Sequence, residues 1–287
     1  MENDILSLLN AGDRRLSKGQ RLIARYITEN YDKAAFMTAG KLGKTVGVSE
    51  STVVRFATEL GFDGYPGMRR AMQEMVRSRL TSVQRIAVAK DMLDGTDVLK
   101  AVMTSDVEKL QSSLEELDRD SFDRAVEAIG QANHLYIVGM RSSTALASFM
   151  GFYMNLLVED MRLIHDTTAN EVYEQIMHIG PGDVYVGISY PRYSSSSLKA
   201  MEFAKRKGAT VIALTDNGNS PFAQLADIPL YAKSDMVSFL DSLVAPMSLI
   251  NALIVAVAAR KRESLADTFD YLEKLWSEYG VFAGATG

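Results

Sequence analysis

Residues 183–209 read DVYVGISYPRYSSSSLKAMEFAKRKGA, a stretch that joins three different patterns. The apolar run VYVGI has the β-branched and aromatic residues that are typical of a strand. The four serines after it, Ser194–Ser197, fit either a flexible linker or a hydroxyl-bearing loop that holds an anion at a helix start. The last run, LKAMEFAKRKGA, is helical in composition and ends at Gly208. We therefore interpret the serines as the first turn of a helix.

Strand-like and helical runs alternate from residue 134 onward. Strands that alternate with helices predict a parallel sheet with right-handed crossovers. Such sheets bind ligands beyond the carboxyl ends of their strands. The strand-like runs are HLYIV (134–138), RLIH (162–165), DVYVGIS (183–189), ATVIALTD (209–216) and IPLYA (228–232).

A second pattern, GKLGKTVGVSESTVVRFATELGF at residues 40–62, fits a helix-turn-helix. Gly43 leaves room for two helices to cross closely, and Gly47 supplies a turn in which positive φ is favourable only for glycine. Ser49 is expected to cap the second helix. Short polar side chains and one guanidinium then face outward, as a helix that enters the major groove of DNA requires.

The candidate DNA-contacting residues follow from this placement. Arg55 is suited to a guanine or a phosphate, and the two lysines of the first helix are suited to phosphates. Two alternatives stay open: a small helical bundle with a chance glycine turn, and a helix-turn-helix that contacts protein. The complete candidate set is Lys41, Lys44, Ser49, Glu50, Ser51, Thr52 and Arg55.

The distribution of charge agrees with a nucleic-acid partner for the N-terminal part. Residues 1–80 carry 13 Lys and Arg against 9 Asp and Glu, a net charge of +4. Residues 81–287 carry 18 against 27, a net charge of −9. A basic module joined to an acidic one indicates that only the N-terminal part meets a polyanion.

The composition, 47% hydrophobic and 23% charged in 287 residues, is that of a globular protein with one or two domains. Without cysteine the chain has neither disulfides nor thiolate metal sites. No metal-ligand spacing is present, so neither a metal nor a cofactor is expected. The uncharged run Ser242–Ala259 is near the length of a membrane span, but Pro246 and Asn251 interrupt it. We expect a core helix there, no membrane segment, and a cytoplasmic protein.

Residues 16–69 resemble the N-terminal domain of RpiR-type bacterial transcriptional regulators. They share its leading Leu-Ser, an Ile-rich helix, the helix-turn-helix and a Leu-Gly-Phe-x-Gly-Tyr exit. The later part resembles the sugar isomerase (SIS) domain of these regulators, which binds phosphosugars. The resemblance implies an all-α helix-turn-helix domain joined to an α/β SIS domain with a five-stranded parallel sheet flanked by helices. The implied partners are double-stranded operator DNA and an anionic sugar or phosphosugar.

Two loops of this chain stand where the family binds its ligand. GMRSST at 139–144 stands in place of a usual Gly-x-Gly-x-Ser, and SYPRYS at 189–194 in place of Ser-x-Ser-Gly-x-Thr. Both follow strands and run into helices, whose free N–H groups and positive dipole ends favour a phosphate. Ser196 and Ser197 are expected to face away from the anion. The implied effector-binding residues are Gly139, Arg141, Ser142, Ser143, Ser189, Tyr190, Arg192, Ser194 and Ser195.

Arginines replace one glycine in each loop. Arg141 takes the position of the second glycine of the first loop, and Pro191 and Arg192 replace the inner serine and the glycine of the second. Losing glycine disfavours a close backbone cradle, whereas each guanidinium adds donors suited to carboxylate or phosphate. Alternatively, either arginine points outward or pairs with an aspartate such as Asp166 or Asp216.

An isomerase of this fold needs a general base, usually Glu or His, near the carbonyl of its substrate. His134 is expected at the edge opposite the loops, His178 on the surface, and Asp241 at a helix N-cap. These residues form no recognisable acid–base pair, so we expect no catalytic residues and a sensor. An isomerase with a fused DNA-binding domain and a SIS-fold dimerisation module with a degenerate pocket stay open. The candidates for a base are His134, His165, His178, Glu171, Glu174 and Asp241.

The expected organisation is a helix-turn-helix domain at 1–78, a linker at 79–112, a SIS effector-binding domain at 113–263 and a C-terminal helix and tail at 264–287. One helix-turn-helix reads few base pairs, so a homodimer or homotetramer is expected. The SIS helices are the main candidates for that contact. A lesser candidate is the apolar stripe Leu265, Phe269, Leu272, Trp276 and Tyr279.

Overall fold

The computed structural model describes residues 16–79, 95–164, 171–236 and 240–281, together with Leu9, Thr81 and residues 83–86. It divides into two compact units. The first comprises Met1–Val102 and Met236–Asp241, and the second Met103–Asp235 and Ser242–Gly287. The functional boundaries expected at 78, 112 and 263 stay predictions.

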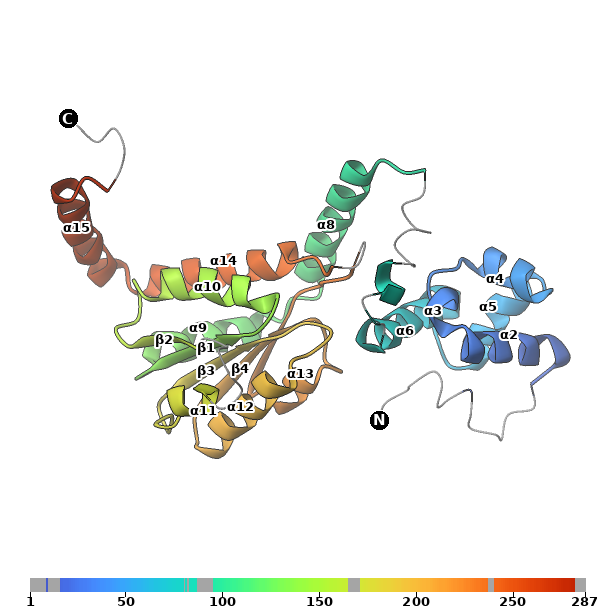
Figure 1. The fold of residues 1–287 in the computed structure, drawn as a ribbon, viewed down its shortest axis with the longest axis horizontal. Coiled ribbons are helices and arrows are strands. Elements are labelled where there is room, and N and C mark those ends of the chain that lie inside the picture. The colour runs from blue at the N-terminus through green and yellow to red at the C-terminus, as the bar shows by residue number, and fades with distance from the viewer. Residues whose placement is uncertain are drawn as a thin grey trace. The chain divides into compact units, whose positions relative to one another are not determined.

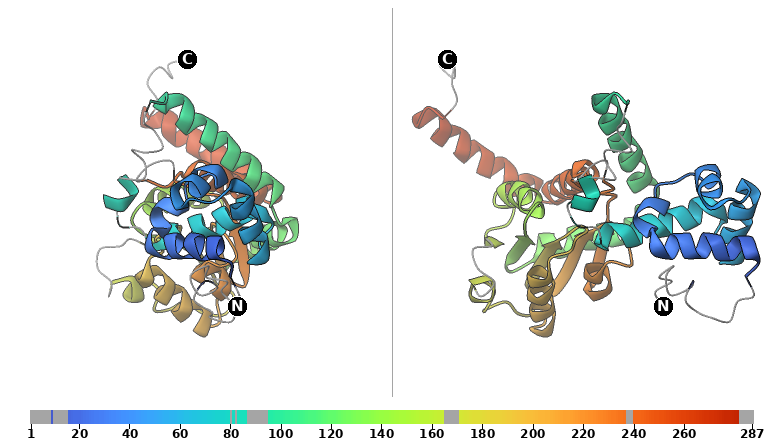
Figure 2. Two further views of the ribbon diagram at one scale, coloured as in Figure 1. Left: turned by 90° about the vertical axis from the view of Figure 1, so that its right-hand side faces the viewer. Right: turned by 45° about the vertical axis from the view of Figure 1, so that its right-hand side comes forward.

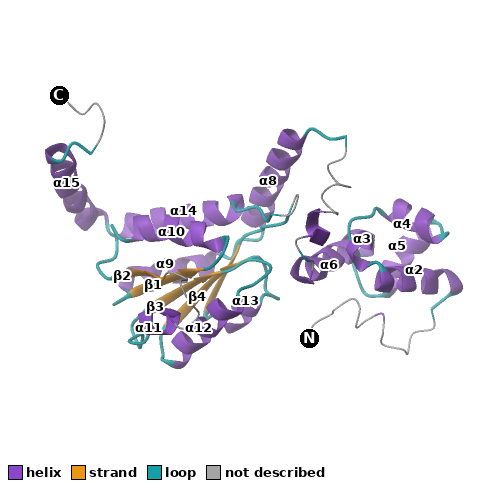
Figure 3. Ribbon diagram, viewed as in Figure 1, coloured by secondary structure: helices purple, strands orange, loops and turns teal. Residues whose placement is uncertain are grey.

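The N-terminal unit is built from short helices and contains no strand among its described residues (Figures 1 and 3). Its core is closed by fully buried side chains such as Ile23, Phe56 and Met68, which come from different helices. The helices are α2 (Lys18–Glu29), α3 (Tyr31–Ala34), α4 (Ala39–Val46), α5 (Glu50–Glu59) and α6 (Gly64–Arg79).

The α4–α5 corner is the helix-turn-helix expected from the sequence. Gly47 ends α4 in the left-handed conformation, with φ of 78°. A Cβ on Gly43 would lie 2.8 Å from the carbonyl oxygen of Val48, so no larger residue fits this crossing. Ser49 caps α5 by accepting a hydrogen bond from the backbone N–H of Thr52 at 3.3 Å. All three expectations are confirmed.

The second unit contains a five-stranded parallel sheet in the order β2-β1-β3-β4-β5. This confirms the predicted fold class. Every expected strand is present, with ends within two residues of those expected. The strands are β1 (Leu135–Gly139), β2 (Met161–Ile164), β3 (Val184–Ile188), β4 (Thr210–Thr215) and β5 (Ile228–Tyr231).

Helices cover both faces of the sheet (Figures 1 and 2). On one face α9 (Arg119–Gln131), α10 (Ser143–Met154) and α14 (Val244–Arg260) enclose an aliphatic core. On the other lie α11 (Glu171–Gln175), α12 (Ser195–Arg206) and α13 (Pro221–Leu225), against the buried rings of Tyr136 and Tyr185. The strands are buried on both faces, as parallel sheets require.

Two further helices precede and follow these elements in the sequence. α8 (Val98–Glu115) precedes α9, and α15 (Arg262–Glu278) follows α14. The uncharged run at 242–259 forms most of α14, which buries one face, including Leu253 and Val257, and leaves Val255 exposed.

No single helix in the described part of the chain is long and apolar enough to cross a membrane. α14 and α15 reach that length and composition only as a pair, and they are bent by 104° relative to each other.

Candidate functional site: the outer face of α5 and two loops of the SIS unit

The outer face of α5 carries the predicted DNA-contacting residues. Glu50, Ser51 and Arg55 are exposed, whereas Val53, Phe56 and Ala57 pack into the core. Thr52 is half-buried, and its hydroxyl lies 2.8 Å from that of Ser49. Lys41 and Lys44 are exposed on α4. The expected orientation of the helix is therefore present.

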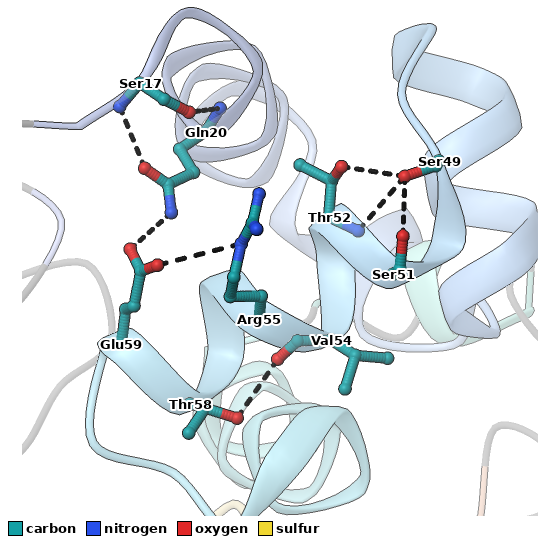
Figure 4. Close-up of polar contacts among 9 residues, drawn as sticks. All are labelled: Ser17, Gln20, Ser49, Ser51, Thr52, Val54, Arg55, Thr58 and Glu59. Atoms are coloured by element: carbon teal, nitrogen blue, oxygen red, sulfur yellow. Dashed lines mark hydrogen bonds and ion pairs between the residues drawn. The ribbon is translucent and has the colours of Figure 1, made fainter.

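An ion pair and hydrogen bonds connect Arg55 through Glu59 to the start of α2 (Figure 4). Arg55 Nε lies 3.8 Å from Glu59 Oε1, and Gln20 Nε2 donates to the other oxygen of Glu59. Gln20 also forms a capping box with Ser17. Gln20 and Glu59 were not among the residues predicted from the sequence. The Ser-x-x-Gln spacing of the capping box was the only signal of Gln20.

In the SIS unit, the two predicted loops begin at adjacent points of the sheet. Gly139, the last residue of β1, pairs with Ile188, the last residue of β3. The next residues, Met140 and Ser189, therefore leave the carboxyl edge side by side. α10 and α12 start a few residues further on, so their N-terminal N–H groups lie at the same edge.

Serine hydroxyls join the two loops. Ser194 caps α12 by accepting from the N–H of Ser197, and its own N–H donates to Ser189 Oγ at 3.3 Å. Ser194 Oγ and Ser196 Oγ lie 3.0 Å apart and donate to Met140 Sδ at 3.4 and 3.1 Å. The run is thus a helix start, as expected. The hydroxyl of Ser196 turns back toward that of Ser194, and its orientation relative to an anion stays a prediction.

The first loop keeps the backbone shape of a glycine-rich loop without its second glycine. Arg141 adopts φ of 57°, a left-handed conformation that is unfavourable for side chains with a Cβ. Gly139 is needed for packing, since a Cβ there would lie 2.5 Å from the carbonyl oxygen of Ser143. Ser143 is buried, whereas Ser142 and Arg141 are exposed at the start of α10. The arginine substitution has therefore not removed the left-handed turn.

Two buried hydroxyls, that of Tyr190 in the second loop and that of Ser197 in the first turn of α12, have no hydrogen-bond partner within the described residues. Tyr190 is 5% exposed, and its hydroxyl makes no hydrogen bond within the described residues. Burial raises the pKa of Tyr190, and the nearby charge of Asp216 raises it further. Asp216 itself accepts hydrogen bonds from Tyr193 Oη at 2.6 Å and Asn217 Nδ2 at 2.8 Å. Arg192 and Ser195 are exposed beside this site.

The candidates for a general base are dispersed. His134 lies at the opposite edge of the sheet, where its ring nitrogens are 2.6 Å from Asp183 Oδ1 and 3.3 Å from Asp160 Oδ2. His178 is exposed, as expected. Glu171 and Glu174 lie on α11, and His165 and Asp166 lie outside the described residues.

Asp241 was expected to cap the last long helix, and that expectation was wrong. The residue before α14 is Leu243, and Asp241 instead accepts from Arg85 Nη1 at 3.1 Å with both carboxylate oxygens. Both side chains are largely buried. A buried guanidinium needs such a counter-charge.

No group of three or more His, Asp or Glu side chains in the described ranges is arranged to hold a metal ion. A hollow of about 350 Å³ lies elsewhere in the SIS unit, against β5 and α14. Its walls are largely apolar, with Leu114, Phe122 and Leu249 among them, so it is a poor match for an anion.

Both parts of the chain match known domain families. Residues 3–79 match the model of the rpiR-family helix-turn-helix domain, and residues 128–256 match the SIS domain. The transcriptional regulator HexR of Pseudomonas aeruginosa is 28% identical over 86% of this chain and 86% of its own.

Two solved structures of similar proteins have the same fold. The sugar isomerase domain of an RpiR transcription factor from Sphaerobacter thermophilus is 29% identical and covers 62% of this chain and 98% of its own, with a TM-score of 0.59. The Vibrio vulnificus NanR protein, solved in complex with ManNAc-6P, is 22% identical and covers 98% and 100%, with a TM-score of 0.60.

A helix-turn-helix module followed by a SIS domain defines a two-domain transcriptional regulator. The chain has the RpiR-type architecture, an rpiR-family helix-turn-helix domain followed by a SIS domain.

Proposed function

We propose that this regulator binds operator DNA through α5 and an anionic sugar derivative, foremost a phosphosugar, at the two loops of its SIS domain. Binding of the sugar changes the affinity for DNA, and the protein acts in the cytoplasm. The observation that carries the proposal is the convergence of the loops after β1 and β3 at the N-termini of α10 and α12. Helix N-termini with serine hydroxyls favour a phosphate.

Two further features support an anionic ligand. Arg141 and Arg192 are exposed beside the loops and bring planar donors suited to phosphate or carboxylate. The hydroxyl of Tyr190 is buried without a partner, a costly arrangement that a ligand relieves. NanR, which shares the fold, was solved with ManNAc-6P.

A sensor fits the described residues better than an isomerase. Proton transfer needs a base close to the substrate carbonyl, but His134 is held at the far edge and His178 is on the surface. The relatives that match both domains are named as regulators.

The test uses the full-length protein with DNA selected from a random duplex library. A panel of pentose and hexose phosphates, ManNAc-6P included, is screened by thermal shift and by anisotropy on the selected DNA. We expect at least one compound to raise the melting temperature and to change the DNA affinity. A ligand that binds the folded protein stabilises it, and a ligand that binds the DNA-bound and free forms unequally changes the affinity for DNA. If no compound stabilises the protein, a SIS-fold dimerisation module is favoured. If the protein converts a compound into a product, the isomerase is favoured.

We also propose a homodimer or homotetramer. On α15, Phe269 and Tyr279 are 38% and 74% exposed, and Leu265 packs against the core of the SIS unit. Light scattering that shows a monomer at every concentration contradicts the assembly. Deleting residues 264–287 measures how much of the assembly depends on the stripe.

A further inference from the structure

One exposed apolar side chain lies on the helix that is proposed to enter DNA. Val54 is 39% exposed, and Ser51, Arg55 and Thr58, which lie around it on the outer face of α5, are exposed as well. Single exposed valines are common on protein surfaces. The significance of Val54 therefore depends on how its neighbours are arranged.

Thr58 extends the apolar surface of Val54. Its hydroxyl donates to the carbonyl oxygen of Val54 at 3.3 Å (Figure 4). With the hydroxyl bonded to the backbone, the methyl group is the part of Thr58 available to an outside partner. Residues four apart lie in one row along a helix, so Val54 and Thr58 form a short row of methyl groups.

The opposite flank of α5 is charged, and its side chains contact other residues of the protein. Arg55 pairs with Glu59, and Glu59 accepts from Gln20. In Figure 4 the isopropyl group of Val54 points away from this pair. The outer face of α5 is thus divided into a guanidinium flank and a methyl flank.

We propose that Val54, together with the methyl group of Thr58, contacts the 5-methyl group of a thymine in the major groove. Thymine is the base that presents a methyl group there, and apolar side chains are its usual partners. Arg55 binds a guanine or a phosphate beside it. This inference rests on the proposed DNA binding and adds a residue that sets sequence specificity.

The experiment removes that methyl group from the DNA. A duplex selected from a random library by the wild-type protein is synthesised with each thymine replaced in turn by uracil, and affinities are measured by fluorescence anisotropy. For the wild-type protein we expect one position at which uracil weakens binding about fourfold, the effect of one buried methyl-sized group. At other thymines the change is small.

Variants then connect the effect to the side chain. Val54→Ala is expected to bind the thymine duplex several-fold more weakly and to bind the uracil and thymine duplexes equally. Val54→Thr preserves the branched shape with one methyl group fewer, and we expect it to reduce the penalty for uracil. Leu22→Ala is the matched control, because Leu22 is 44% exposed on α2, and this variant retains the full penalty.

The outcomes separate the inference from the proposed function. An equal uracil penalty in wild type and Val54→Ala overturns the inference. The inference is also overturned if no uracil substitution weakens binding by the wild-type protein. If Arg55→Ala still weakens DNA binding in that case, the proposed DNA binding through α5 is retained. Failure to enrich any sequence from the library overturns both.

Discussion

α5 and α12 begin with the same local chemistry in the two units of the protein. Ser49 and Ser194 are both N-caps, and each accepts a hydrogen bond from the N–H three residues on at 3.3 Å. Each also has a second hydroxyl within 3.0 Å, that of Ser51 or of Ser196. The sequence signal, a serine before a run of helix formers, is the same in both.

The surroundings of the two caps differ. Ser49 is exposed and follows the exposed lysines of α4, so the start of α5 is open to an extended partner. Ser194 is half-buried and touches Ser189 and Met140, which directly follow two neighbouring strands. A cap thus fixes where a helix starts, whereas contacts from distant parts of the chain determine what its N-terminus binds. An open start suits a long polyanion, and an enclosed one suits a small anion.

The largest expected effect concerns the glycines that allow each helix to approach its neighbour. Gly139→Ala places Cβ 2.5 Å from Ser143 O, and Gly43→Ala places it 2.8 Å from Val48 O. Because both obstacles are backbone atoms, each variant is expected to lose about 3 kcal/mol of stability. Urea denaturation followed by circular dichroism measures this loss.

Gly130→Ala is the control for these two variants. It lies in α9 with no atom within 4 Å of its added Cβ, so alanine is expected to stabilise the helix by about 0.5–1 kcal/mol. Equal stabilities of Gly139→Ala and Gly130→Ala would show that the β1–α10 approach is looser than described.

The next effect separates base reading from phosphate binding on the open helix start. Arg55→Ala is expected to weaken binding to selected DNA by about 1–3 kcal/mol, because a guanidinium contact to guanine is lost. Lys41→Ala is expected to weaken all sequences alike and to lower the slope of affinity against salt. Anisotropy titrations at several salt concentrations measure both. Unchanged binding by Arg55→Ala contradicts the placement of α5 in the groove.

A smaller effect compares the caps directly. Ser49→Ala and Ser194→Ala should each cost about 1 kcal/mol of stability, the usual value of a serine N-cap. Their binding phenotypes should be opposite: Ser49→Ala weakens DNA binding, and Ser194→Ala weakens the phosphosugar. Thermal melts and titrations with both ligands on both variants test this. If both variants lose the same ligand, the distinction between the two helix starts is wrong.

The last effect on stability, no larger at neutral pH than that of a cap, involves Tyr65, whose hydroxyl donates to Met37 O at 2.8 Å. Tyr65→Phe should cost about 1 kcal/mol there. Burial raises the pKa of Tyr65 to about 12 from 10.0. Its contribution to stability is therefore complete below pH 10 and is lost between pH 10 and 12.

Denaturation of the N-terminal unit at pH 8, 10 and 12 measures this dependence. The wild-type unit should lose more stability over the range than the Phe variant. Identical pH profiles contradict the buried position of this ring.

The sequence predicted the fold well because its signals are local. Alternating runs located every strand, and Gly43, Gly47 and Ser49 defined the helix-turn-helix. The physical requirements at these positions, positive φ, close approach and a capping oxygen, depend on few neighbours. The site loops were also located, since parallel strands bring their carboxyl ends together.

Features that depend on contacts between distant residues were not predicted. Glycine loss was expected to disfavour a close backbone cradle, and the left-handed φ that Arg141 adopts was not predicted. The pairing of Asp241 with Arg85 spans 156 residues, and no pattern near either residue announces it. The approach of Ser196 to Met140 likewise depends on how two loops pack.

The measurement that tests the central claim most directly is calorimetry of the phosphosugar that alters DNA binding. It is titrated into wild-type protein, Arg192→Ala and Ser194→Ala, with Arg206→Ala as control for an exposed arginine at the other end of α12. Each charge-assisted hydrogen bond lost should cost about 1.5–3 kcal/mol. We predict at least tenfold weaker binding for Arg192→Ala and Ser194→Ala, wild-type affinity for Arg206→Ala, and unchanged affinity of all three for DNA without the sugar. Wild-type sugar affinity in both loop variants would contradict the account and place the sugar site elsewhere.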